Sequence, residues 1–120
     1  MRFVADLHLH SRFARATSRS LNPETLYKWG ALKGLTVVGT GDFTHSVWIA
    51  ELKERLEPAE AGLYRLKHEF RAPVEADLYP SCRGEIRSLL STEISVIYKK
   101  ADKTRKVHHV VLIPGFEAVE

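Results

Sequence analysis

Cysteine is almost absent from this sequence: Cys82 is the only one among 120 residues. A single thiol excludes an internal disulfide framework and any metal site built from several thiolates. The chain also lacks an apolar run approaching the roughly 18 residues that a membrane-spanning helix requires. Its first residues do not have the basic-then-apolar layout of a signal peptide. We therefore expect a soluble, cytoplasmic protein with no membrane partner.

Two nucleotide-binding signatures are missing as well. The sequence contains no GxxxxGK[ST] phosphate loop, so nothing in it supports ATP-driven motor activity. Gly39-Thr40-Gly41 begins like a dinucleotide-binding loop, but Thr44 stands where the third glycine belongs. The charge balance of 18 basic against 15 acidic residues gives a net charge of +3. That surplus suits an anionic substrate without identifying one.

What the chain does contain is typical of one globular domain, with 44% hydrophobic and 28% charged residues. Strand-like segments at residues 3–10 and 35–38 alternate with two helix-like segments. Short connections between such segments imply parallel strand pairing, so we expect an α/β fold.

The two helices are predicted from their end signals. Asn22 can cap the first helix and Pro23 suits its first position, while Gly34 suits a position just beyond its last turn. Ser46 can cap the second helix, which should end before Pro58.

The second half of the chain is less regular. Residues 58–85 contain three of the five prolines and predict an irregular excursion with a short strand at residues 63–67. Residues 86–98 and 107–113 predict two strands that form a hairpin around a charged turn. Residues 114–120 resemble the start of a helix, which favours a chain that is only the front of a larger domain.

The strongest functional signal lies in the first predicted strand. Alternation of side chains places Asp6, His8 and His10 on one face, with about 6–7 Å between successive members. Imidazole is a preferred ligand of zinc, manganese and iron. The pattern Asp-x-His-x-His therefore favours a metal site, and the alternative is a pair of partly exposed structural histidines.

Further candidate ligands lie at other predicted strand ends. Asp42 and Glu93 are candidates, although Asp42 could cap a loop and Glu93 could face water on an edge strand. One of His108 and His109 should point toward the site and the other away. His45 is either a ligand or a helix-flanking residue. Because parallel strands end at one rim, such groups can hold two or three divalent ions with a bridging carboxylate.

Two basic groups are candidates for phosphate contact. Arg12, Arg15 and Arg19 follow the histidine segment and can form forked hydrogen bonds with phosphates. The predicted hairpin turn provides a second group, in which Lys103 and Arg105 are the phosphate-binding candidates and a solvated turn is the alternative. The other basic residues of that turn are Lys99, Lys100 and Lys106.

These motifs resemble the PHP (polymerase and histidinol phosphatase) family of metal-dependent phosphoesterases. The phrase DLHLHS at residues 6–11 is similar to the first family motif, and TGD at residues 40–42 is similar to a variant of the second. The resemblance implies a multinuclear metal site, with zinc as the leading metal and manganese, iron or magnesium as alternatives. It assigns His8 and His10 to one ion, Glu93 as a bridge and His108 to the second ion.

The resemblance also implies a fold: the N-terminal half of a distorted (β/α)7 barrel, truncated, so that residues 1–120 form a partial PHP domain. Phe43 stands where the second motif usually has histidine, and the late Asp-x-His motif of the family has no counterpart here. From the resemblance we expect incomplete metal binding and little or no activity if the 120 residues act alone.

Within the family, the resemblance is to the endonuclease Q group. It is carried by residues 16–19, 39–45, 62–66 and 106–109 in addition to the first motif. This implies a metal-dependent DNA repair endonuclease that cuts on the 5′ side of deaminated bases and at abasic sites. DNA is then the expected partner, with replication or repair proteins as further ones. Two interpretations stay open beside it: a PHP phosphatase acting on a small phosphomonoester, and a non-catalytic metal-binding PHP domain.

Overall fold

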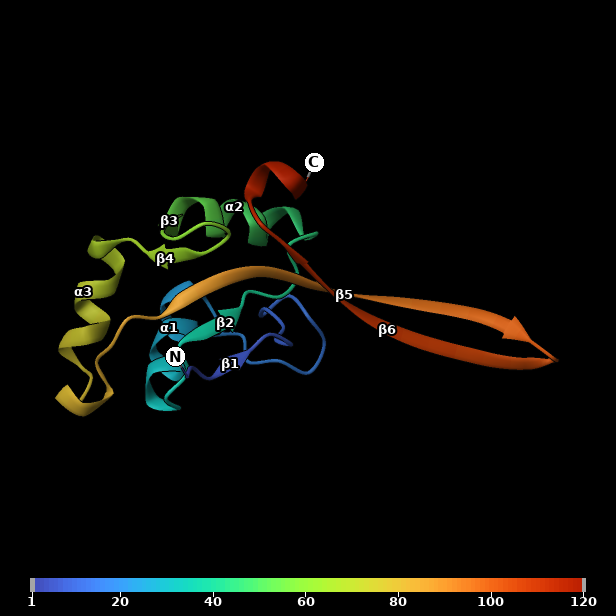
Figure 1. Ribbon diagram of the computed structural model, residues 1–120, viewed down its shortest axis with the longest axis horizontal. Coiled ribbons are helices and arrows are strands. Elements are labelled where there is room, and N and C mark those ends of the chain that lie inside the picture. The colour runs from blue at the N-terminus through green and yellow to red at the C-terminus, as the bar shows by residue number, and fades with distance from the viewer. Residues whose placement is uncertain (1, 120) are drawn as a thin grey trace.

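The computed structural model describes residues 2–119, which form a mixed sheet with helices packed on it. The strands are β1 (Ala5–Asp6), β2 (Val37–Gly39), β3 (Leu56–Pro58), β4 (Tyr64–Leu66), β5 (Arg87–Lys100) and β6 (Lys103–Ile113). Their order is β1-β2-β5-β4-β3, with β6 paired to β5 (Figure 1). β1, β2 and β5 are parallel, whereas β3, β4 and β6 pair in antiparallel fashion. The predicted α/β class is confirmed, in the form of a mixed sheet.

The first predicted strand is much shorter than expected. Pairing between β1 and β2 covers only Ala5 and Asp6, not residues 3–10. After β2 the chain turns through Gly41, which has a positive φ of 67°, so β2 has no further residues to pair with residues 7–10. His8 and His10 therefore lie on a segment that follows the strand.

Helix α1 (Pro23–Leu32) has the predicted ends. The Asn22 side chain accepts a hydrogen bond from the Thr25 amide, and the Thr25 hydroxyl accepts one from the Asn22 amide. This reciprocal capping satisfies two backbone donors that the first turn leaves free. Gly34 follows the helix with a φ of +72°, a conformation that glycine adopts without steric cost.

Helix α2 (Ser46–Arg55) begins one residue differently from the prediction. Its N-cap is His45, whose Nδ1 accepts a hydrogen bond from the Trp48 amide, so the prediction that Ser46 caps this helix is wrong. The helix ends at Arg55, and β3 follows immediately.

The excursion predicted over residues 58–85 is more regular than its sequence indicates. β4 corresponds to the expected short strand, but α3 (His68–Ala76) was expected to be a loop. Pro73 lies inside this helix, where it lacks a backbone donor and disrupts the usual helical signal. Packing against α1 supports α3 despite that proline. Short 3-10 turns follow at η1 (Pro80–Cys82) and, in place of the predicted terminal helix, at η2 (Phe116–Val119).

The predicted hairpin is confirmed and is the longest feature of the molecule. β5 and β6 pair from Leu90–Ile113 out to Lys100–Lys103, and the two turn residues Ala101 and Asp102 both have positive φ. Turns of this kind match the right-handed twist of the strands they join. The hairpin projects well beyond the body of the protein (Figure 1), and the molecule with its hairpin is 56 Å long.

The hydrophobic core lies between the helices and the body of the sheet. Trp48 and Leu52 of α2 and Leu90 of β5 are completely buried. The indole Nε1 of Trp48 donates a 2.8 Å hydrogen bond to the carbonyl of Gly41. The core is thereby tied directly to the loop that follows β2. Within residues 2–119, no helix has the length and apolar character needed to cross a bilayer.

We predict that Trp48→Phe lowers the free energy of unfolding by about 1–3 kcal/mol, because the buried Gly41 carbonyl loses its donor and a gap opens beside it. Urea denaturation measures the effect. Trp29→Phe is the matched control, since the Trp29 side chain is 54% exposed. Equal stability of the two variants would contradict the proposed role of Trp48.

Candidate metal centre

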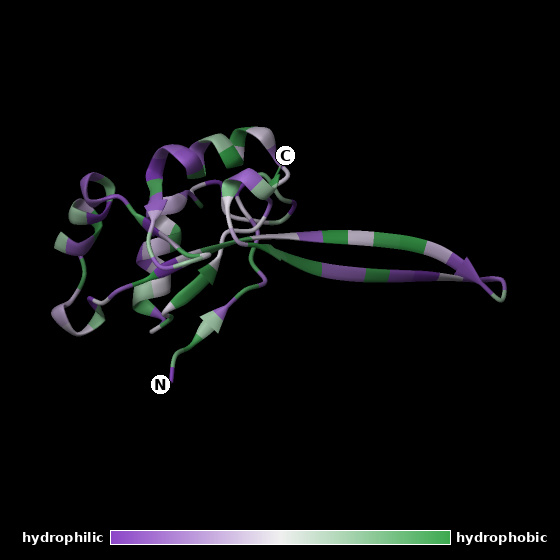
Figure 2. Cartoon of the chain, turned by 45° about the horizontal axis from the view of Figure 1, so that its top comes forward, coloured by the Kyte–Doolittle hydropathy of each residue, from purple (hydrophilic) through white to green (hydrophobic). Residues whose placement is uncertain are grey.

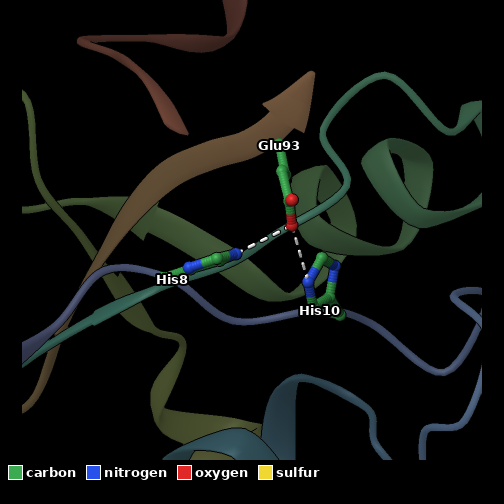
Figure 3. Close-up of side chains that lie close together, drawn as sticks. All are labelled: His8, His10 and Glu93. Carbon is green, nitrogen blue, oxygen red and sulfur yellow. Dashed lines mark hydrogen bonds and ion pairs between the residues drawn. The ribbon is translucent and has the colours of Figure 1, made fainter. Parts of the chain in front are cut away.

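Two histidines from the N-terminal segment converge on one carboxylate of β5. The Oε2 atom of Glu93 lies 2.7 Å from His8 Nε2 and 3.0 Å from His10 Nε2 (Figure 3). The two imidazole rings stand edge to face, with their centroids 5.4 Å apart. Side chains that are 85 residues apart in the sequence are thus brought to a single point.

A third histidine reaches the same carboxylate from β6. His108 Nδ1 lies 2.5 Å from Glu93 Oε1, and it is also 2.9 Å from the Ser95 hydroxyl. Ser95 is the cross-strand partner of His108, so the hairpin register sets this contact. His109 pairs with Ile94 and belongs to the opposite face of the hairpin. Of the two neighbouring histidines, His108 is the one placed at the cluster.

These contacts hold Glu93 in its charged form. The hydrogen bond from His8 is the main cause that lowers the pKa of Glu93, and the contact with His108 acts in the same direction. The carboxyl side chain is 17% exposed, whereas that of His8 is 54% exposed. The cluster is therefore anionic at its centre and open to solvent on the side of His8.

The His8–His10 segment lies in unusually close backbone contact with the end of β2 and the loop that follows it. A Cβ atom on Gly39 would lie 2.6 Å from the carbonyl oxygen of Leu7, and one on Gly41 would clash with the carbonyl oxygen of Leu9. Only glycine permits this approach at both positions. Gly39 and Gly41, which resemble part of a dinucleotide-binding loop, thus allow the backbone of the histidine segment to pack closely against them.

Asp42 lies behind His10. Its Oδ2 accepts hydrogen bonds from the amide and the hydroxyl of Ser11, at 2.7 and 2.6 Å, and its Oδ1 is 3.6 Å from His10 Nδ1. A carboxylate on the far nitrogen of an imidazole is the arrangement that orients metal-binding histidines. Asp42 is thus placed to orient His10, and its predicted role as a direct ligand stays a prediction.

Two buried serines at the site were not predicted from the sequence. Ser11 is completely buried against Asp42, and Ser91 accepts a hydrogen bond from the Gly41 amide through its hydroxyl. Serine is common in loops and strands, so the residue type alone does not indicate that Ser11 and Ser91 belong to the site. Their positions, one residue after the DxHxH phrase and two before Glu93, were the only available indication.

Two other predicted ligands are engaged elsewhere. The Asp6 carboxylate accepts a hydrogen bond from the His8 amide, which shapes the backbone next to the cluster. The ring of His45 caps α2 and stacks on Phe13 with a centroid distance of 4.1 Å. The arrangement of His45 is that of a helix-flanking residue.

The predicted phosphate-binding residues are distributed over several surfaces. Arg12 pairs with Glu51 at 2.6 Å and lies over the ring of Phe13, so it anchors the loop after His10 to α2. Arg15 and Arg19 are exposed on the same loop. On the hairpin, Lys103 and Arg105 pair with Lys100 and Tyr98, on the face opposite to Glu93.

The donor set at Glu93 fits a divalent metal ion. The ligand atoms of His8, His10 and Glu93 all lie within 4.8 Å of one another. Zinc binds imidazole nitrogen and carboxylate oxygen at about 2.0–2.2 Å, which places neighbouring ligands about 3.3–3.5 Å apart. Small side-chain movements would bring the three atoms to that spacing. Neutral histidine and ionised carboxylate are also the forms that bind metal.

No protein-family model matches this chain. Among curated proteins, the uncharacterized protein MJ0043 of Methanocaldococcus jannaschii is 51% identical over 49 residues, which make up 41% of this chain and 6% of MJ0043. Two solved structures are similar in fold, each with a TM-score of 0.65 and 24% identity over 98% of this chain. One is the lesion-specific endonuclease PfuEndoQ from Pyrococcus furiosus. The other is an endonuclease Q complex with a 27-mer duplex substrate that has an abasic lesion at the active site.

These likenesses establish a fold similar to a part of endonuclease Q. The chain spans 23% of the PfuEndoQ chain and 24% of the endonuclease chain in the DNA complex. At this identity, the shared feature is the arrangement of strands and helices, and function has to be argued from the site itself.

We predict that Gly41→Ala disrupts the histidine segment, because the added Cβ meets the Leu9 carbonyl and the φ of +67° is unfavourable for alanine. The expected result is a loss of more than about 1 kcal/mol of stability together with weaker zinc binding. Calorimetric titration with zinc and thermal unfolding measure both. Gly84→Ala is the control, since a Cβ there meets no atom within 4 Å. Unchanged zinc affinity in the Gly41 variant would show that this contact does not position the ligands.

Proposed function

We propose that this chain carries the metal-binding part of a DNA endonuclease site that hydrolyses phosphodiester bonds next to deaminated or abasic nucleotides. The observation that carries the proposal is the convergence of three imidazoles, from His8, His10 and His108, on the single carboxylate of Glu93. Histidines gathered around one carboxylate are typical of sites that hold more than one divalent ion, with the carboxylate as the bridge.

In this proposal each residue of the cluster has a distinct task. His8 and His10 face Glu93 Oε2, and His108 faces Oε1, so the two oxygens divide the histidines into two sets. Asp42 Oδ1 lies 3.6 Å from the far nitrogen of His10, and a hydrogen bond formed there on metal binding would fix which nitrogen of that ring faces the cluster. Divalent ions bound there, with zinc as our first choice, would supply an activated water and neutralise charge on a phosphate.

The open side of the cluster suits a large substrate. The His8 side chain is more than half exposed, and burial along β5 ends at Glu93, so an extended polymer can approach the site. The fold likeness to endonuclease Q supports DNA with a damaged or missing base as the substrate class. Metal identity and lesion preference are further parts of this proposal.

The first test is metal binding by the 120-residue chain. Native mass spectrometry with added zinc should detect at least one bound ion, and His8→Ala should weaken binding about tenfold or more. His68→Ala is the matched control, because His68 is exposed on α3. Equal zinc binding by the two variants would contradict the assignment of the cluster.

The second test is cleavage. The natural protein that contains these residues, rather than the 120 residues alone, should cut an end-labelled duplex with one abasic site or one deoxyuridine on the 5′ side of the lesion, in a reaction that chelator stops and metal restores. Cleavage of a small phosphomonoester but not of DNA would replace the proposal with a phosphatase. Metal binding without hydrolysis of either substrate would replace it with a non-catalytic metal domain.

A further inference from the structure

The outer part of the β5–β6 hairpin has no partner within the described residues. From Ile94 to Lys106 every residue is exposed, including Ile97 at 62%. The hydropathy colouring shows hydrophobic segments near the body and a hydrophilic tip (Figure 2). Two strands that stand alone in water gain little stability from packing, so this extension is costly unless something binds it.

The strand register divides the hairpin into two faces. Directly paired residues lie on the same face, and successive pairs alternate between faces. We call the face that includes Glu93 the site face. Its pairs are Glu93–Val110, Ser95–His108, Ile97–Lys106 and Lys99–Thr104. The opposite face has the pairs Ile94–His109, Val96–Val107, Tyr98–Arg105 and Lys100–Lys103.

The site face places cations in line with the candidate metal centre. At about 3.4 Å per residue, the Lys106 pair lies roughly 13 Å from Glu93 along the hairpin, and Lys99 lies roughly 20 Å away. One strand of B-form DNA advances about 3.4 Å per nucleotide, so the roughly 20 Å between Glu93 and Lys99 corresponds to about six nucleotides. Lys106 and Lys99 are therefore spaced to contact phosphates several nucleotides away from a phosphodiester bond that is held at Glu93.

From this geometry we propose that the site face of the hairpin is a DNA-binding arm that contacts duplex flanking the bond at the metal centre. The proposal rests on the proposed function and deepens it. Lys99 and Lys106 bind backbone phosphates, and Ile97 packs on the sugars or base edges between them. The basic residues that matter are therefore those that share a face with Glu93, rather than Lys103 and Arg105.

Shape and charge both favour duplex DNA on this face. A two-stranded β-ribbon is one of the two protein elements that fit the major groove of B-form DNA. The site face has lysines, hydroxyl groups of Ser95 and Thr104, and no acidic side chain beyond Glu93. Any phosphodiester held at the cluster must also continue into nucleotides that leave the site, and the site face begins at the cluster itself.

The test compares charge-matched double variants in their affinity for a fluorescent duplex with one abasic site, over a range of potassium chloride concentrations and without added divalent cation. Lys99→Ala with Lys106→Ala should weaken binding about tenfold and reduce the slope of log affinity against log salt by about 1.8, the value for two phosphate contacts. Lys103→Ala with Arg105→Ala should have a clearly smaller effect. Lys28→Ala with Lys33→Ala, both exposed on or next to α1, should have none.

Each outcome decides the matter. Equal losses for the two hairpin variants would overturn the face assignment, because the hairpin would then act only as a source of positive charge. Wild-type affinity in both hairpin variants would overturn the DNA-binding arm and favour a protein partner on the hairpin, while metal-dependent cleavage could still stand. Failure of the unaltered chain to bind DNA at all would overturn the arm, whereas the proposed function is decided separately by the cleavage assay. Circular dichroism of each variant confirms that the hairpin is folded.

Discussion

Close contact between two backbone segments is the constraint on which the site depends. Residues 7–10 lie against the end of β2 and the loop after it, at distances that no residue with a Cβ atom allows at Gly39 or Gly41. This contact brings His8 and His10 over the middle of β5, where Glu93 meets them. The parallel pairing of β1 covers just Ala5 and Asp6, so this contact extends the support of the N-terminal segment toward His10.

Buried polar contacts then fix the segment from both sides. The indole of Trp48, in the core, donates a hydrogen bond to the Gly41 carbonyl. The hydroxyl of Ser91, on β5, accepts one from the Gly41 amide. Beyond His10, Arg12 pairs with Glu51, which also pairs with Arg55 at 2.6 Å. The half-buried ion pairs join the loop to α2, where removing one partner would leave the other charge poorly solvated. The ligands thus stand on a rigid support, as a metal site of defined geometry requires.

Much of the fold could be predicted from the sequence because its signals are local. The cap at Asn22, the glycine after α1 and the hairpin of β5 and β6 each follow from residue types at short spacing. α3 escaped prediction because Pro73 hides a helix that packing against α1 supports. The two-residue length of β1 could not be predicted, because tertiary contact with the following loop ends the pairing.

The candidate site was predictable in its members but not in its arrangement. The spacing of His8 and His10 indicates a metal ligand pair, and alternation along β6 requires one of two histidines to face the site. Which one does so depends on the register that pairs His108 with Ser95, a fact of the folded hairpin. The position of Asp42 behind His10 likewise depends on the loop and on Ser11, which binds its other oxygen. The candidate residues can be predicted from their spacing in the sequence, whereas their positions relative to one another depend on tertiary contacts.

The most direct test of the central claim is the anomalous scattering of zinc in crystals of this chain grown with the metal. Our account predicts a peak about 2.0–2.2 Å from His8 Nε2, His10 Nε2 and Glu93 Oε2. Zinc bound only at other residues, such as His68 or Cys82, or no peak beside Glu93, would contradict it.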